Sequence, residues 1–287
     1  MPIIRVENLT HIYSQGTPFE KVAIDHISLE IERGEMVGLI GHTGSGKSTF
    51  IQHLNGLLMP TEGTVFFDGK DIHDSKAFTR DVRFRVGLVF QYPEYQLFEE
   101  TVFRDIAFGP KNMGLSAAEI EERVHEAAGF AGVDEAWLDA SPLELSGGQK
   151  RRVAIAGVIA MMPQVLILDE PTAGLDPSAC ESILQKIQAY RRETDCTILL
   201  VSHNMDDVAR FASRLVVFNE GKIMMDGTPA EIFDRADELT EVGLTVPVAT
   251  EIARALRARG VSIPESIYTI SYLRKLLLSR KEGGEIC

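Results

Sequence analysis

The sequence predicts an α/β fold in which a largely parallel sheet is flanked by helices. We expect an antiparallel β subdomain before this sheet, an inserted helical subdomain and a C-terminal helical extension. Two observations predict the parallel sheet. Short, nearly continuous apolar segments are bounded by turn residues, as in strands buried on both faces, and helical patterns lie between them. The four segments are MVGLIG (36–41), VGLVF (86–90), VLILD (165–169) and TILLVS (197–202).

The other elements follow from local patterns along the chain. Residues 3–35 alternate short apolar runs with turns, which predicts a small antiparallel sheet. Residues 92–162 lack strand patterns and are predicted to form helices inserted between two strands of the main sheet. One helix is expected to begin at Ser116, because Ser116 and Glu119 have the spacing of a capping box. Another is expected at Asp176-Pro177, an N-cap followed by proline.

After about residue 235 the pattern changes to two amphipathic helices. The first is predicted to begin at Pro247 and the second at Pro264. Apolar residues recur in them at helical spacing: Val248, Ile252, Ala255 and Leu256 in the first, and Ile267, Ile270, Leu273 and Leu277 in the second. Such helices either pack on their own domain or contact a partner, and the sequence favours neither reading.

Composition restricts the classes of function. The chain has 287 residues, 45% of them hydrophobic, and a formal net charge of −13. This charge disfavours unassisted binding to a nucleic-acid backbone. Three cysteines without a CxxC pair, and no signal-peptide pattern, suggest a reducing, cytosolic setting. The longest apolar run, residues 153–162, is too short to cross a bilayer, so other chains must supply the spans if the protein works at a membrane.

The segment GHTGSGKST has the spacing of a P-loop and lies between a predicted strand and a predicted helix. Its glycines let backbone N–H groups point at phosphates, and the helix N-terminus adds partial positive charge. Lys47 is expected to reach the β- and γ-phosphates of ATP, and Ser48 to bind Mg²⁺. The expected nucleotide contacts in this segment are Gly41, His42, Thr43, Gly44, Ser45, Gly46, Lys47, Ser48 and Thr49.

Candidate residues lie at the ends of three other predicted strands and in a turn-like segment before the P-loop strand. Asp169 and Glu170 emerge at the carboxyl end of VLILDE; Asp169 is expected to hold Mg²⁺ and Glu170 to orient or deprotonate the attacking water, although such a pair can also cap the next helix. His203 follows TILLVS at the same sheet edge and could donate a hydrogen bond to the γ-phosphate. Gln91 is a candidate contact for Mg²⁺ or the water. Tyr13 could stack on adenine or serve only local packing.

A second phosphate-binding composition, LSGGQKRR, covers residues 145–152. Alone, it also fits a helix N-terminus with a serine cap and a basic face. Together with the P-loop, Gln91, VLILDE, AGLD (173–176) and His203, in this order, it resembles the ABC-type ATPases over about residues 3–233. The resemblance implies a P-loop ABC ATPase core that hydrolyses ATP with Mg²⁺, in head-to-tail pairs.

In such pairs each ATP lies between the P-loop of one chain and the signature motif of the other. The resemblance therefore assigns the LSGGQ residues to the partner's ATP. It also makes Tyr13 the adenine-stacking aromatic, Gln91 the sensor of a transmembrane partner, and His203 the switch histidine. The signature residues, and the aspartate of the loop that joins the two sites, are Ser146, Gly147, Gly148, Gln149 and Asp176.

A narrower resemblance concerns residues 41–58 and 90–112, which are similar to ATPase subunits of energy-coupling-factor transporters, importers of vitamins and metal ions. QYPEYQ and Thr43 indicate the second of the two A-type subunits, although Leu143 stands where an aromatic residue is usual. The implied partners are a second ATPase subunit (a copy or a relative), a transmembrane coupling subunit and a substrate-binding membrane subunit, with no nucleic acid. The implied location is peripheral, on the cytoplasmic face of the cell membrane.

We therefore expect a nucleotide-binding domain over residues 1–233, with its helical insertion at about 92–162, and an extension over 234–287 that helps the two ATPases meet. YPEYQLF (92–98) suits either a groove for a membrane partner's helix or the core of the insertion. Alternatives are a subunit of another ABC importer, or a soluble ABC-type ATPase acting on nucleic acid or ribosomes, which the charge disfavours. LSGGQ and His203 disfavour a P-loop kinase, because a kinase needs no signature acting in trans.

Overall fold

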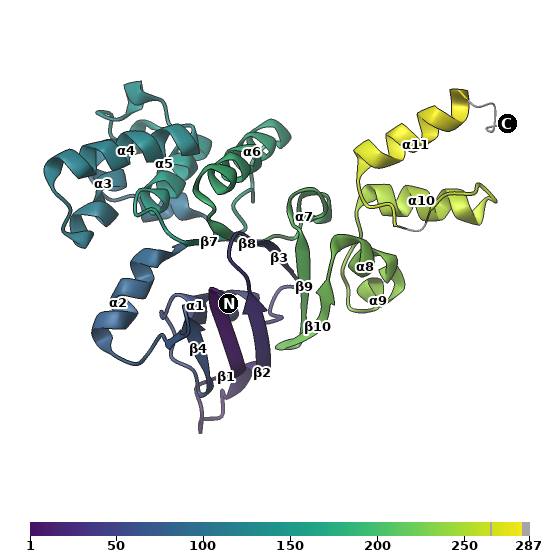
Figure 1. The fold of residues 1–287 in the computed structure, drawn as a ribbon, viewed down its shortest axis with the longest axis horizontal. Coiled ribbons are helices and arrows are strands. Elements are labelled where there is room, and N and C mark those ends of the chain that lie inside the picture. The colour runs from purple at the N-terminus through teal and green to yellow at the C-terminus, as the bar shows by residue number, and fades with distance from the viewer. Residues whose placement is uncertain (265, 283–287) are drawn as a thin grey trace.

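The computed structural model describes residues 1–264 and 266–282, which form two sheets surrounded by helices (Figure 1). The larger sheet has the order β10-β9-β3-β8-β7-β6, and its strands are parallel except for β10, which pairs antiparallel with β9. The strands are β3 (Met36–Ile40), β6 (Val86–Val89), β7 (Val165–Asp169), β8 (Thr197–Val201), β9 (Arg214–Asn219) and β10 (Lys222–Gly227). The four predicted strands are confirmed as β3, β6, β7 and β8, whereas β9 and β10 were not predicted.

The predicted antiparallel sheet is also confirmed, with the order β2-β1-β4-β5. Its first two strands come from the N-terminal segment, and the other two follow the P-loop helix. The strands are β1 (Ile4–Tyr13), β2 (Lys21–Ile31), β4 (Glu62–Phe67) and β5 (Lys70–Asp71). The prediction from residues 3–35 therefore described only half of this sheet, because β4 and β5 are recruited from further along the chain.

Alternation along the main strands explains why their apolar runs are continuous. In β3, Val37 and Leu39 belong to the core shared with the antiparallel sheet and α1 (Lys47–Leu54), and Met36 and Ile40 belong to the core on the other face. The same alternation holds in β7 and β8, since successive side chains of a strand point to opposite faces. Both faces are covered, so the strand interiors are apolar, and the polar residues Asp169 and Thr197 stand only at strand ends.

Helices fill the segment between β6 and β7, as predicted. In Figure 1 they form a group at one end of the molecule, apart from the antiparallel sheet. They are α3 (Val102–Met113), α4 (Ala117–Ala131) and α5 (Gly147–Ile159), with the short 3₁₀ helices η1 (Pro93–Gln96), η2 (Glu135–Trp137) and η3 (Pro142–Glu144). The capping box at Ser116 and Glu119 is present, and Asp176 caps α6 (Pro177–Thr194) through the backbone N–H groups of Ser178 and Ala179.

The remaining helices lie before β6 or after β8. They are α2 (Lys76–Arg85), α7 (Met205–Phe211), α8 (Pro229–Asp234), α9 (Ala236–Glu241), α10 (Val248–Ala258) and α11 (Ile270–Glu282). The predicted domain boundary at 233/234 falls inside α8, whose Ile232 and Phe233 pack in the main core, and the division into domains stays a prediction. Over the described ranges, none of the helices has both the length and the apolar composition required to cross a bilayer.

The start of the second C-terminal helix is predicted wrongly, and the predicted apolar side of the first is only partly buried. In α10, Ala249 and Ala253 are buried and Leu256 packs beside them, whereas Val248 and Ile252 are 47% and 41% exposed. The second helix begins at Ile270 instead of Pro264. The Thr250 hydroxyl donates to the carbonyl of Ile267, 2.8 Å away, and thereby helps hold the residues just before α11 against α10.

Candidate active site

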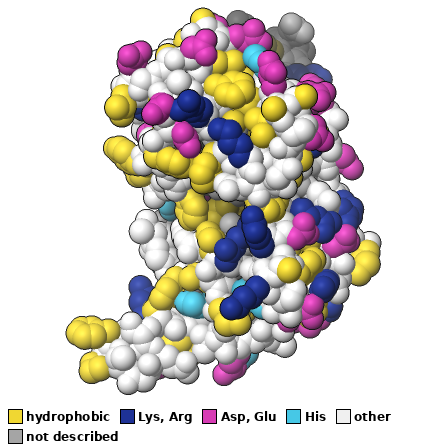
Figure 2. All heavy atoms as spheres, turned by 90° about the vertical axis from the view of Figure 1, so that its left-hand side faces the viewer, with side chains coloured by type: hydrophobic (Ala, Val, Ile, Leu, Met, Phe, Trp, Pro, Cys, Tyr) yellow, Lys and Arg dark blue, Asp and Glu magenta, His cyan; other side chains and the backbone are white. Residues whose placement is uncertain are grey.

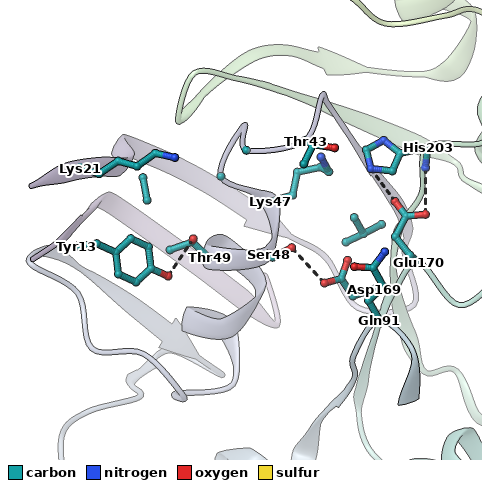
Figure 3. Close-up of a pocket in the computed structure, with 14 residues that line it drawn as sticks. Tyr13, Lys21, Thr43, Lys47, Ser48, Thr49, Gln91, Asp169, Glu170 and His203 are labelled. Carbon is teal, nitrogen blue, oxygen red and sulfur yellow. Dashed lines mark hydrogen bonds and ion pairs between the residues drawn. The ribbon is translucent and has the colours of Figure 1, made fainter. Parts of the chain in front are cut away.

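The carboxyl edge of the main sheet carries a pocket in which many of the predicted site residues meet (Figure 3). They come from the P-loop and α1, from the ends of β1, β6 and β7, and from the segment after β8. The pocket is lined by Tyr13, Lys21, Ala23, Thr43, Gly44, Gly46, Lys47, Ser48, Thr49, Gln91, Asp169, Glu170, Val201 and His203. Lys21 and Ala23 of β2 and Val201 of β8 were missed, because nothing local in the sequence marks them as pocket residues.

The P-loop is shaped by glycines whose positions cannot take a side chain. A Cβ on Gly41 would lie 2.4 Å from the carbonyl oxygen of Phe218 in β9, and one on Gly46 would lie 2.6 Å from that of Ala23 in β2. Both glycines also have positive φ angles, 153° and 104°. The loop is therefore clamped between the two sheets, with its backbone turned toward the pocket.

Three predicted contacts in the loop do not line the pocket: Gly41, His42 and Ser45. The ring of His42 is held by Asn219 Oδ1, 3.1 Å from its Nε2, and by the carbonyl of Thr43, 2.9 Å from its Nδ1. The buried Ser45 accepts the backbone N–H of Gly221 at 3.0 Å. These residues hold the loop against the end of β9 and the turn that follows it, and so support the position of the P-loop.

Lys47 supplies the positive charge of the pocket. Its ammonium donates to the carbonyls of Gly41, at 2.6 Å, and His42, at 3.0 Å. The side chain is buried, which lowers the pKa of Lys47, while the nearby Glu170 and Asp169 carboxylates act in the opposite direction. A cation held by neutral carbonyls in this way is available to phosphate oxygens.

Asp169 and Glu170 face Lys47 across the pocket. The Ser48 hydroxyl donates to Asp169 Oδ2 at 3.2 Å. Burial raises the pKa of Asp169, and the Ser48 hydrogen bond opposes this. Burial also raises the pKa of Glu170, to about 7, assisted by the neighbouring Asp169 charge and opposed by the backbone N–H of His203 and by Lys47. A carboxylate with a pKa near 7 is suited to accept a proton at neutral pH.

Glu170 is also held in an uncommon backbone conformation. Its φ is 53°, in the left-handed region that non-glycine residues seldom adopt, and its N–H donates to the carbonyl of Val201 at 3.0 Å. Such strain is common at functional sites. The result is that the side chain turns from the end of β7 toward the P-loop (Figure 3).

His203 lies against this carboxylate. Its Nε2 is 3.2 Å from Glu170 Oε1, and its backbone N–H donates to Oε2 at 3.4 Å. The ring contact lacks hydrogen-bond geometry, so within the described residues Oε1 accepts no hydrogen bond. Burial and the Lys47 charge lower the pKa of His203. One oxygen of Glu170 is thus left to accept a proton from water or another donor.

The pocket also offers oxygen ligands for a hard cation. The Ser48 hydroxyl, the Asp169 carboxylate and the Gln91 side-chain amide line the same pocket. Mg²⁺ prefers octahedral oxygen ligands, and in phosphate sites it takes few from the protein and the rest from phosphates and water. The three residues fit such an ion.

The signature residues lie outside this pocket. Ser146 caps α5 in a capping box with Gln149, so the helix-start reading of LSGGQKRR is correct as local structure. Ser146 and Gly147 are exposed, and nothing lies within 4 Å of the position of a Cβ on Gly147. Asp176 is likewise exposed at the start of α6. These residues present backbone N–H groups and side chains to the solvent instead of to their own P-loop.

Sequence reasoning missed one buried ion pair beside the signature. Arg151 is 2% exposed and binds Glu94 of η1 through two hydrogen bonds of 3.1 and 2.8 Å. Its Nη1 donates to the carbonyls of Pro171 and Ala173, just after Glu170. The helix-start reading of LSGGQKRR would place Arg151 on a basic helix face, whereas the side chain is buried. Glu94 is the single acidic residue of YPEYQ, but the sequence does not show that it meets Arg151, because only the fold brings these residues together.

The segment after Gln91 is mostly on the surface. Tyr95 and Phe98 are 85% and 66% exposed, whereas Leu97 packs against the main core. The core reading of this segment is therefore wrong for Tyr95 and Phe98. The side of the molecule that carries α2, α3 and α4 displays hydrophobic side chains close to Lys and Arg (Figure 2). A hollow lined by Arg80, Phe84, Met113, Arg123 and Met161 also lies beside α2.

Comparisons with known proteins give a consistent result. A profile of the ABC transporter family matches residues 24–173. The energy-coupling factor transporter ATP-binding protein EcfA2 of Clostridium perfringens is 57% identical over 96% of this chain and 97% of its own length. The EcfA2 of Caldanaerobacter subterraneus subsp. tengcongensis is 55% identical over 99% of both chains.

Solved structures agree with these matches. The structure of cbiO1 from Clostridium perfringens, part of the ABC transporter complex cbiONQ, has a TM-score of 0.74 and 40% identity, covering 84% of this chain and 94% of that one. The dimeric ATP-binding cassette MJ0796 bound to ADP and Pi has a TM-score of 0.71 and 29% identity, covering 78% and 98%. The chain belongs to the ABC transporter family and, within it, to the energy-coupling factor transporter ATP-binding proteins.

Proposed function

We propose that this chain binds ATP with Mg²⁺ in the pocket beside the P-loop and hydrolyses it to drive an energy-coupling-factor transporter. The observation that carries the proposal is the meeting of Lys47, Ser48, Asp169, Glu170 and His203 in one pocket. A cation, two metal ligands and a carboxylate of raised pKa are the groups that phosphoryl transfer to water requires.

Each residue then has a role that its surroundings support. Lys47 binds the β- and γ-phosphate oxygens, and Tyr13 stacks on the adenine. Glu170 accepts a proton from the water that attacks the γ-phosphorus, as the bond from phosphorus to the ADP oxygen breaks. His203 donates a hydrogen bond to the γ-phosphate. Ser48, Asp169 and Gln91 hold Mg²⁺, which neutralises charge on the phosphates.

Closure of the ATP pocket requires a second ATPase subunit, which is a copy of this chain or a relative of it. The exposed Ser146 and Gly147 support this, because their helix start has backbone donors for a phosphate but does not line the pocket of its own chain. Donors that arrive only on closure would make hydrolysis depend on the paired state. The dimeric MJ0796 cassette bound to ADP and Pi gives a precedent in a relative of the same fold.

The other proposed partners are a transmembrane coupling subunit and a substrate-binding membrane subunit, with this chain peripheral on the cytoplasmic face of the membrane. Exposed Tyr95 and Phe98 beside Gln91 form the proposed docking surface. Tyr95→Ala should weaken co-purification with the coupling subunit without changing ATP binding. Phe19→Ala, an equally exposed aromatic between β1 and β2, is the matched control. Equal retention of the partner by both variants would remove Tyr95 from docking.

Glu170→Gln tests the chemistry. The amide can hold the water but cannot accept its proton, so ATP binding should persist while turnover falls by two to four orders of magnitude, the range of about 10²–10⁴ typical of general bases. The measurement is phosphate release by the reconstituted transporter, with the partner's equivalent glutamate also replaced. Full turnover would exclude the proposed role.

A further inference from the structure

Behind Tyr13 lies a closed circuit of side-chain contacts that none of the proposed roles uses. The Tyr13 ring packs edge-on against His11, with centroids 4.5 Å apart, and the His11 ring packs edge-on against His53 at 4.8 Å. His11 Nδ1 is 3.1 Å from His53 Nε2. His53 Nδ1 is 2.7 Å from the carbonyl of Thr49, whose Oγ1 is 3.2 Å from the Tyr13 hydroxyl (Figure 3).

The direction of each hydrogen bond follows from chemistry. The Thr49 carbonyl can only accept, so His53 Nδ1 carries a proton and donates it. His53 is 0% exposed, and burial lowers its pKa to about 4, so the ring is neutral at physiological pH and its Nε2 must accept. His11 Nδ1 is then the donor. This assignment satisfies both nitrogens of the buried His53 ring.

The circuit joins two parts of the site that are distant in sequence. Tyr13 and His11 belong to β1, whereas Thr49 and His53 belong to α1, the helix that begins at the P-loop. Thr49 follows the proposed Mg²⁺ ligand Ser48 directly. Tyr13 is thereby linked to the helix that begins at the phosphate-binding loop in two ways, directly by its hydroxyl and through His11 by its ring.

We propose that His11 and His53 are positioning residues that hold the Tyr13 ring at a fixed place relative to the P-loop, so that it can stack on adenine. Tyr13 is half-exposed at the end of a strand and would otherwise have to be ordered when the base arrives. Ordering a group in advance lowers the cost of binding. The inference rests on the proposed function, since it assumes that the base lies against Tyr13.

The test separates recognition of the base from recognition of the phosphates. Binding of Mg-ATP and of Mg-tripolyphosphate to the full-length chain is measured for the wild type and for His53→Leu, which cannot bond to His11 or Thr49. Stacking of a base on an aromatic ring contributes strongly to binding whatever the base. We expect the Kd for ATP to rise about tenfold and the Kd for tripolyphosphate to change less than about twofold. His53→Gln, which can still offer an oxygen to His11, should recover part of the loss.

A double-mutant comparison establishes whether the histidine acts through the tyrosine. Tyr13→Ala should weaken ATP binding by itself, and adding His53→Leu to it should have little further effect, because the residue being positioned is gone. If His53→Leu does not fold, His11→Leu in the strand serves the same comparison.

Specific outcomes would overturn the inference. Equal weakening of ATP and tripolyphosphate would mean that His53 supports the P-loop alone. A full additional loss in the Tyr13→Ala background, or no effect of Tyr13→Ala itself, would show that the histidines do not act through Tyr13. Failure of the wild type to bind either ligand would instead contradict the proposed function.

Discussion

Replacing Glu170 with glutamine should stabilise the empty chain, and by an amount that grows with pH. The carboxyl is buried, which raises its pKa from 4.5 to about 7. A pKa that is one unit higher in the folded than in the unfolded state corresponds to about 1.4 kcal/mol. The ionised Glu170 carboxylate therefore lowers the stability of the folded chain by about 3 kcal/mol. Glutamine is neutral and nearly the same size, and does not carry this cost.

The direction of this pH dependence follows from which state, folded or unfolded, binds the Glu170 proton more tightly. Below pH 4.5 the carboxyl is protonated both folded and unfolded, so the cost is absent. Between pH 4.5 and about 7 the unfolded chain releases the proton first and the cost grows; above pH 7 it is present in full. The stability advantage of Glu170→Gln over wild type should therefore approach about 3 kcal/mol at pH 8 and fall toward zero near pH 4.5.

Urea unfolding of the nucleotide-free chain at several pH values, at constant ionic strength, measures this difference. Glu121→Gln, at an exposed position on α4, is the matched control and should show no comparable trend. An advantage that does not change between pH 5 and 8, or a variant less stable than wild type at pH 8, would refute the claim that burial of this charge opposes folding.

Three further outcomes can be measured. Lys47→Ala should weaken ATP binding by at least an order of magnitude, as calorimetry would show, and unchanged affinity would exclude its phosphate contact. Gly148→Asp should leave ATP binding to the separated chain intact. In the assembled pair it should block the site built on the partner's P-loop, because the new carboxylate repels the γ-phosphate there. Nucleotide trapping measures each site separately. Loss of trapping at this chain's own P-loop instead would contradict the head-to-tail arrangement. Arg151→Met should lower the free energy of unfolding by about 3–5 kcal/mol, because it leaves the largely buried Glu94 without its cation. Adding Glu94→Met should restore part of that loss, and strictly additive losses in urea unfolding would contradict the pairing.

Features with local causes were predictable from sequence. The strands β3, β6, β7 and β8 are marked in the sequence by apolar runs, and the helix caps at Ser116 and Asp176 by short-range spacing. The P-loop, with the acidic pair after β7, placed the pocket at the correct edge of the sheet, because parallel strands end at the same edge.

Features that depend on distant partners were not predictable. Lys21 reaches the pocket only because β2 pairs with β1 beside the P-loop helix. In α10 the pattern offered a stripe of larger apolar residues, but the neighbouring segment packs against Ala249 and Ala253, where small side chains allow close approach. A helix with apolar residues on more than one side does not reveal which side the chain will cover.

The guanidinium of Arg151 has a mechanical consequence for a paired ATPase. It holds the start of the signature helix, the η1 turn after Gln91 and the backbone after Glu170 at a single point. Because Arg151 is buried and bonded to all three, we expect a force on η1 to reach the signature helix as well. In a head-to-tail pair that helix faces the other chain's nucleotide. A force on one subunit would then act on the nucleotide bound by the other, which would couple the two ATP sites.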